Sequence, residues 1–366
     1  MSDCSVYTIG WICAIEPELI AALELLDKRH DQPEGLPPND TNAYVLGEMG
    51  GHKIVIASLP DGEYGISKAT DVAVNLARTF PNVRLGLMVG IGGGAPRLPT
   101  NDIRLGDVVV SSAKDGGSGV YQYDFGKTIQ DKEFISTGQL DKPPKTFRTA
   151  ISVLKADHRR EGNSIHKQIE LILEKNSRLK DEYQRPEETS DRLYRSEYTH
   201  CEGKATCDDC GDKESTIVTR TSRSQRRDNP AIHYGLIASA NQLMKNALIR
   251  DKLAKENNVL CFETEAAGLM DHFPCLVIRG ICSYADTHKN KEWQGYAAMA
   301  AAVYAKELLG RIPPRSESSE ERPRNMKLLV DEVRKDRLSI RLSPDFSTDF
   351  YHLKRSCCQG TGQWFL

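Results

Sequence analysis

Long apolar runs are missing from this 366-residue chain. No stretch approaches the roughly 20 apolar residues that a transmembrane helix needs, and residues 1–11 lack the basic region and apolar core of a secretory signal. The net charge is only −2, so no excess of positive charge attracts nucleic acid or a membrane surface. No repeat of fixed period occurs either. These absences predict an intracellular, cytoplasmic protein that binds neither nucleic acid nor a membrane.

Cysteine is present ten times, and without a signal peptide this favours reduced thiols over disulfides. Three of the cysteines, Cys201, Cys207 and Cys210, follow His200 in a charged segment. Their C-x5-C-x2-C spacing allows a structural zinc ion. Only one C-x-x-C pair has the standard spacing, so free thiols in a loose insertion stay an open alternative. No cofactor is expected to be required.

Strand and helix patterns alternate along most of the chain. Apolar runs typical of buried strands occupy residues 7–15, 84–90, 105–111, 231–239, 259–262 and 275–282, and helical spacing occupies 16–26, 66–80, 145–183, 266–273 and 293–309. Two further runs, 44–49 and 53–59, predict a hairpin. The alternation predicts an α/β protein with three layers, α/β/α, around a mostly parallel sheet. The small residues at 297–302 allow close packing of the last helix, against either this chain or another subunit.

One domain, residues 1–312, accounts for these elements. Residues 185–229 are charged, contain cysteines and have few large apolar side chains, which is typical of an insertion. Residues 313–325 have the composition of a linker. Residues 326–366 are expected to be a C-terminal extension that begins a further, truncated region.

Polar side chains gather where two predicted strands end. Glu263, Thr264 and Glu265 follow the first strand, and a polar turn that begins at Ser283 follows the second. This is typical of a ligand crevice at the carboxyl edge of an open α/β sheet. Residues 90–94 indicate a glycine-rich turn, in which Gly92 and Gly93 leave backbone N–H groups accessible to an anion or a sugar.

Six motifs in chain order resemble the purine nucleoside phosphorylase and methylthioadenosine (S-adenosylhomocysteine) nucleosidase superfamily. They are residues 9–18, 90–94, 105–111, 234–239, 262–267 and 277–286. The insertion and residues 286–294 are similar to a fungal branch, in which this domain stands at the N-terminus of multidomain, NLR-like proteins, ahead of a signalling NTPase domain or repeats. The resemblance implies a nucleoside phosphorylase-like fold around a mixed sheet, and a homo-oligomer.

The superfamily cleaves the bond between a purine base and ribose through a transition state that resembles an oxocarbenium ion, which negative charge stabilises. By this resemblance, Glu18 activates water and Glu265 binds the ribose hydroxyls, with help from Glu263. The alternative for Glu18 is a first-turn glutamate that stabilises its helix. Leu243 and Met244 match positions that line the purine pocket, although plain core packing is equally compatible with them.

Two departures from the superfamily pattern matter. Met88 stands where phosphorylases carry a phosphate-binding arginine, which favours hydrolysis because a buried phosphate without a cation is costly. Ser283 stands where the general-acid aspartate is usual. Either Asp286 replaces that acid, or activity is reduced or absent. The sequence therefore predicts a purine nucleoside or nucleotide N-glycosidase. The alternatives are a phosphorylase and a non-catalytic nucleoside-binding signalling module.

Basic residues on both sides of the predicted site suggest a nucleotide substrate such as ATP. Arg220 and Arg223 precede one predicted strand, and His288 and Lys289 follow the Ser283 turn. We expect some of them to bind substrate phosphates. The alternative is a solvated basic loop.

Overall fold

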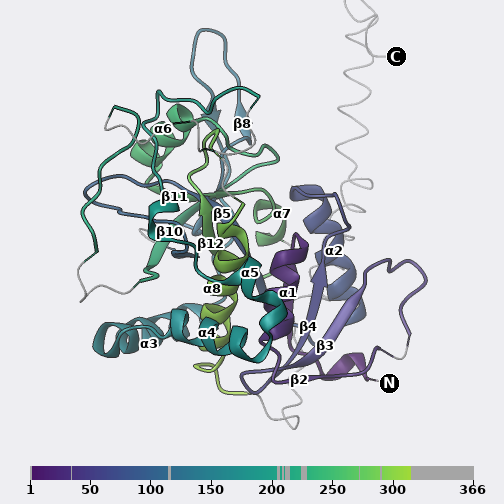
Figure 1. Cartoon of the computed structure of the whole chain (residues 1–366). Helices are drawn as coiled ribbons and strands as arrows, with labels where there is room; N and C mark the ends of the chain where they lie inside the picture. The colour runs from purple at the N-terminus through teal and green to yellow at the C-terminus, as the bar shows by residue number, and fades with distance from the viewer. Residues whose placement is uncertain are drawn as a thin grey trace, which may run out of the picture. The chain divides into compact units, whose positions relative to one another are not determined.

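One ten-stranded sheet runs through the described part of the chain in the order β11-β10-β6-β12-β5-β1-β4-β3-β2, with β7 paired to β10 (Figure 1). Its strands are β1 Ile9–Cys13, β2 Lys28–Arg29, β3 Tyr44–Met49, β4 His52–Ser58, β5 Leu85–Gly94, β6 Val108–Ser111, β7 Val120–Gln122, β10 Ile232–Ser239, β11 Val259–Glu263 and β12 Cys275–Ser283. The pairs β1–β4, β1–β5, β5–β12, β6–β10, β7–β10 and β10–β11 are parallel, whereas β2–β3, β3–β4, β5–β11 and β6–β12 are antiparallel. The predicted mixed, mostly parallel sheet is confirmed.

This computed structural model describes residues 2–33, 35–113, 117–203, 207, 210, 215–223, 229–271, 273–288 and 291–314. They belong to one compact unit, Met1–Pro314. Most of the predicted linker and the whole predicted C-terminal extension lie outside the described residues. No helix among the described residues is long and apolar enough to cross a membrane.

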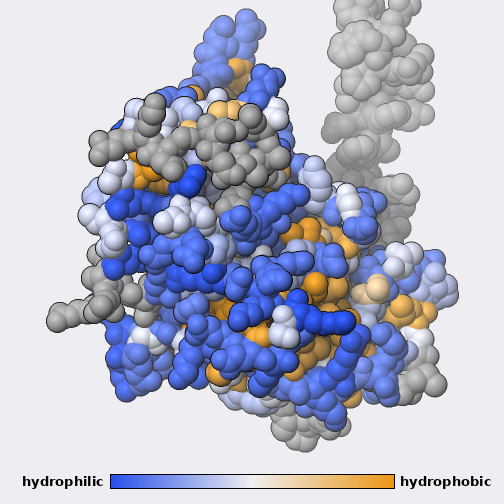
Figure 2. All heavy atoms as spheres, in the orientation of Figure 1, coloured by the Kyte–Doolittle hydropathy of each residue, from blue (hydrophilic) through white to orange (hydrophobic). Residues whose placement is uncertain are grey.

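Helices cover both faces of the sheet. They are α1 Glu16–Glu24, α2 Ile66–Thr79, α3 Lys145–Glu161, α4 Ile165–Lys175, α5 Lys180–Tyr183, α6 Ala247–Asn257, α7 Ala267–Met270 and α8 Trp293–Leu309; short 3-10 turns occupy Cys4–Val6, Ser177–Leu179 and Glu188–Ser190, and a small separate sheet pairs β8 Gly126–Lys127 with β9 Ile135–Ser136. Helix α8 packs on β12 and β5, with α1, α3, α4 and α5 against it, whereas α2 packs with α7. On the face shown in Figure 2, hydrophilic residues prevail and hydrophobic ones emerge in strips between them. The three-layer architecture is the predicted one.

Helix α8 is buried almost along its whole length. Residues 297–302 are each 0–1% exposed, because the helix lies directly on the sheet. A Cβ atom on Gly280 of β12 would come within 1.8 Å of the Ala297 carbonyl oxygen. The small residues of α8 therefore pack against this chain's own sheet, which answers the question left open by the sequence.

The glycines at 90–94 lie inside β5, so the predicted turn is wrong. Strand β5 continues to Gly94, and its last residues pair with both β12 and β11. Glycine is required because a Cβ on Gly92 would lie 2.5 Å from the Cys261 sulfur, and one on Gly93 would lie 2.8 Å from the Ala285 Cβ. The second pairing of β11 closes β5, β12, β6, β10 and β11 into a ring.

Candidate active site

A cavity of about 250 Å³ opens where β5, β11 and β12 end. This volume is near the small end of the range for small-molecule sites. The predicted site residues that line it are Glu18, Gly92, Gly93, Leu243, Met244, Glu263, Thr264, Glu265, Ser283 and Asp286. Segments that are far apart in the sequence therefore share one hollow.

Glu18 reaches the cavity from the first turn of α1, where Pro17 occupies an early helix position that needs no N–H donor. Its carboxylate accepts the backbone N–H groups of Ala14 at 2.7 Å and of Ile91 at 2.8 Å. A longer bond of 3.3 Å from the Ile15 N–H also caps the helix, so the helix-stabilising role holds as well. Burial raises the pKa of Glu18 to about 7, even though Arg279 and the two N–H groups favour the charged form.

Arg279 of β12 is the contact that joins the acidic residues. Its Nη2 donates to Glu263 and, at 3.1 Å, to Glu265, and its Nη1 lies 3.8 Å from the Glu18 carboxylate. All four side chains are buried. Burial opposes the charge on Arg279, but the three carboxylates outweigh it and raise the pKa of the guanidinium.

Glu263 and Glu265 have different surroundings. Glu263 accepts the backbone N–H groups of Glu265 at 3.1 Å and of Ala266 at 2.9 Å, so it is held by the start of the following turn. Burial raises the pKa of Glu263, although Arg279 lies beside it. Glu265 accepts from the Thr264 hydroxyl and from Arg279. Three carboxylates around one guanidinium leave an excess of negative potential, which would stabilise a cation in the cavity.

The far wall of the cavity is the chain after β12. The register of β12 against β5 shifts between Ile281 and Ser283, and such a bulge turns a side chain toward a site. Ala285 has a left-handed backbone with φ 52°, a strained conformation for a residue with a Cβ. Asp286 accepts the His288 N–H at 2.8 Å, and its second oxygen lies 4.0 Å from Arg250 Nη1.

The structure does not bring the predicted phosphate ligands into this cavity. Arg220 lies 3.0 Å from the Asp191 carboxylate and donates to the Tyr284 hydroxyl at 2.8 Å, and Arg223 donates to both oxygens of Asp107. Both guanidinium groups therefore serve the packing of the insertion, because the buried Asp107 and the partly buried Asp191 satisfy them.

Two further basic positions follow the Ser283 turn. His288 is buried and stacked on Tyr194, with ring centroids 3.8 Å apart, so it does not face the cavity either. Lys289 lies outside the described residues. Lys291 is an exposed cation that lines the cavity.

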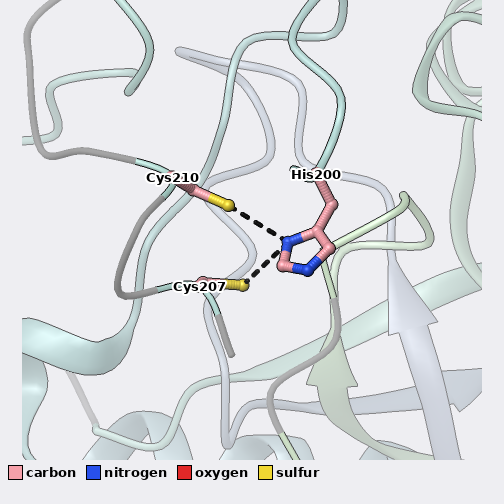
Figure 3. Close-up of side chains that lie close together, drawn as sticks. All are labelled: His200, Cys207 and Cys210. Atoms are coloured by element: carbon pink, nitrogen blue, oxygen red, sulfur yellow. Dashed lines mark hydrogen bonds between the residues drawn. The ribbon is translucent and has the colours of Figure 1, made fainter. Parts of the chain in front are cut away.

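Three of the four predicted metal ligands come together in the insertion (Figure 3). His200 Nδ1 lies 3.1 Å from the Cys210 sulfur and 3.7 Å from the Cys207 sulfur. The candidate ligand atoms all lie within 4.8 Å of one another. Cys201, the fourth predicted ligand, is not in this group.

Sequence reasoning missed the role of Arg279. Its signal was a charged residue inside the apolar run of β12, which is rare unless the charge is paired. Tyr64 and Phe262 also line the cavity, and their residue types gave no signal. A second hollow of about 620 Å³ lies beside β10, but it has no carboxylate among its described lining residues.

Solved nucleosidases share this fold. The chain aligns with futalosine hydrolase of Helicobacter pylori (TM-score 0.52, 17% identity, 83% of this chain and 97% of that one) and with its 5′-methylthioadenosine/S-adenosylhomocysteine nucleosidase (0.52, 16%, 83% and 98%). The corresponding nucleosidase of S. pneumoniae, solved with a transition-state inhibitor, aligns similarly (0.52, 18%, 84% and 100%). The predicted nucleoside phosphorylase and nucleosidase fold is confirmed.

A closer relative by sequence is a nucleotide-binding leucine-rich repeat (NLR)-like protein of the fungus Hyaloscypha variabilis. It is 45% identical over 312 residues, which are 85% of this chain and 30% of that protein. The chain thus spans less than a third of the relative's length. No family model matches the chain.

Proposed function

We propose that this domain is a hydrolytic N-glycosidase that cleaves the base–ribose bond of a purine nucleoside or nucleotide. The observation that carries the proposal is that Glu18 and Glu265 line one cavity and are joined through Arg279. The nucleosidases that share the fold support the reaction class, and the excess of carboxylate supports a cationic transition state.

Each step can be assigned to residues of this chain. Glu18, with a pKa of about 7, accepts a proton from water as the water oxygen bonds to the anomeric carbon. The bond from that carbon to the purine nitrogen breaks, and the electron pair leaves with the base, which takes up a proton from solvent water while Glu18 later returns its proton to solvent. Glu265 accepts hydrogen bonds from the ribose hydroxyls, and Ser283 or Asp286 faces the departing base.

The test is base release from adenosine, methylthioadenosine, AMP and ATP, measured by chromatography with and without inorganic phosphate. We expect free base and free sugar at a rate that phosphate does not change. Glu18→Gln and Glu265→Gln are each expected to lower kcat by about 10²-fold or more. Glu16→Gln is the matched control, because Glu16 is an exposed acid in the same helical turn. Unchanged base release by Glu265→Gln would overturn the proposal.

Ser283 favours a second candidate function, in which the domain binds a nucleoside without cleaving it. A serine hydroxyl donates a hydrogen bond but is a poor acid, and a general acid contributes about 10²–10⁴-fold. Calorimetric binding of adenosine without base release, together with base release by Ser283→Asp, would establish this candidate over the first. Comparable base release by the wild-type chain and by Ser283→Asp would exclude a function of binding without cleavage.

A further inference from the structure

We propose that His200, Cys207 and Cys210 bind one zinc ion, and that the ion anchors the insertion to the chain beside Asp286. The proposal concerns the insertion and does not depend on the proposed glycosidase activity. Imidazole and thiolate are the donors that zinc prefers in structural sites. Figure 3 shows both cysteine sulfurs directed at the same ring nitrogen of His200.

The distances suit an ion between these atoms. Zinc bonds of about 2.3 Å to sulfur and about 2.0–2.1 Å to nitrogen place tetrahedral sulfur and nitrogen ligands about 3.6 Å apart. The two sulfur–nitrogen distances here, 3.1 and 3.7 Å, lie on either side of that value. Cys207 and Cys210 are both free thiols, and their C-x-x-C spacing is standard for a zinc-binding pair.

His288 is a neighbouring side chain whose buried ring nitrogens lack hydrogen-bond partners among the described residues. Its ring centroid lies 5.6 Å from that of His200, with the two planes at 89°. Its Nδ1 lies 3.5 Å from the Asp286 carboxylate. Its ring nitrogens are not among the ligand atoms that all lie within 4.8 Å of one another, so we assign the protein ligands to His200, Cys207 and Cys210 and leave His288 as a buried neighbour of the site.

The same segment already contacts the wall of the cavity. The His200 backbone N–H donates to the Thr287 hydroxyl at 2.8 Å, and the Tyr198 hydroxyl donates to the Cys210 carbonyl at 2.8 Å. An ion held by His200, Cys207 and Cys210 would fix the segment that contacts Thr287, and so would hold the insertion against the loop that carries Asp286. The insertion thereby becomes a brace for that loop.

The first measurement is metal content of the full chain purified without added metal. We expect about one zinc per chain, lost on treatment with a strong chelator together with a fall in melting temperature of at least about 4 °C. Replacement by cobalt is expected to give the thiolate charge-transfer absorption and the strong visible bands of a tetrahedral site. A metal-free wild-type chain that takes up no cobalt, or one with a Cys207–Cys210 disulfide, would overturn the proposal.

Variants then test each ligand. Cys207→Ser and Cys210→Ser are expected to lose the zinc, whereas Cys201→Ser, a matched change in the same loop, is expected to keep it. His288→Phe keeps an aromatic ring for the stack on Tyr194 and removes none of the three ligands, so we expect it to keep the zinc. Zinc retention by Cys207→Ser and Cys210→Ser, or zinc loss from Cys201→Ser, would overturn the assignment of the ligands. If the serine variants fail to fold, the cobalt spectrum of the wild-type chain still decides whether the site exists.

Discussion

At the scale of single residues, the state of Glu18 should govern how activity depends on pH. Burial raises the pKa of Glu18 to about 7, and the proposed role as a base needs the ionised carboxylate. We therefore expect kcat/KM to rise with pH through a midpoint near 7 and to fall about tenfold per pH unit well below it. A pH–rate profile of base release measures this. A profile that is flat between pH 5 and 8 would contradict the role of Glu18 as base.

Gly90 shares its space with Glu18. A Cβ atom at position 90 would lie 2.2 Å from Glu18 Oε1, so Gly90→Ala should displace the carboxylate. A displacement of about 1 Å can cost about 10²-fold in rate, and we expect kcat to fall by about that factor. Gly35→Ala is the control, because nothing lies within 4 Å of a Cβ there. Equal activity of the two variants would show that the position of Glu18 is unimportant.

At the scale of elements, β12 and α8 are in close contact through Gly280. A Cβ at this position would lie 1.8 Å from the Ala297 carbonyl oxygen, and overpacking of a core commonly costs about 1–3 kcal/mol. We expect Gly280→Ala to lower the free energy of unfolding by about 3 kcal/mol, because the clash is with backbone. Urea denaturation would measure it.

Gly310→Ala, after the end of the same helix, is the matched control for Gly280→Ala. The nearest atom to a Cβ there is 3.4 Å away, so we expect little change in the free energy of unfolding. If Gly280→Ala lowered the free energy of unfolding as little as Gly310→Ala does, α8 would be able to move away from the sheet without a loss of stability.

Helices and strands were predictable where their sequence pattern is local. The prediction failed where an element depends on contacts between distant segments. Helix α8 begins at Trp293 and ends at Leu309, as predicted, because small and apolar residues run unbroken through its centre, from Gly295 to Ala305. The sequence predicts a turn at the end of β5 because glycine carries no side chain and so shows no alternation of apolar and polar residues. The reason for those glycines, the approach of Cys261 and Ala285, is a contact between distant segments.

At the scale of the whole molecule, the insertion is attached to the sheet through Asp107. This buried carboxylate lies beside Arg223 and 2.9 Å from His233. Burial alone would raise its pKa, but these partners lower the pKa to about 2. Because the pKa is below that of an unfolded aspartate, the stabilisation is complete above pH 4 and is lost as pH falls through 2.

Removal of Arg223 should therefore cost the whole domain stability. Arg223→Met leaves Asp107 buried without its main partner, and breaking such a pair costs about 3–5 kcal/mol. We expect that loss in the free energy of unfolding at pH 7, and a smaller loss near pH 2, where Asp107 is protonated. Arg195→Met, at an exposed position of the same segment, is the control. A loss independent of pH would show that Arg223 acts through packing.

The site as a whole was only partly predictable. The carboxylates and Ser283 line one cavity, because they stand at or soon after strand ends, which parallel topology gathers on one edge of a sheet. The arginines were misplaced because local charge does not reveal that Asp107 and Asp191 satisfy them. The role of Arg279 depends on three acids from two distant segments, and no single stretch of sequence contains that relation.

The position of Arg279 also has a consequence for the order in which the chain is made. Glu18 leaves the ribosome long before residue 279, yet the only guanidinium among the described cavity-lining residues belongs to Arg279. Until β12 is synthesised and inserted between β5 and β6, the buried acids lack their counter-charge and the hollow cannot close. A nascent chain released before that strand would therefore carry these carboxylates without the guanidinium that joins them.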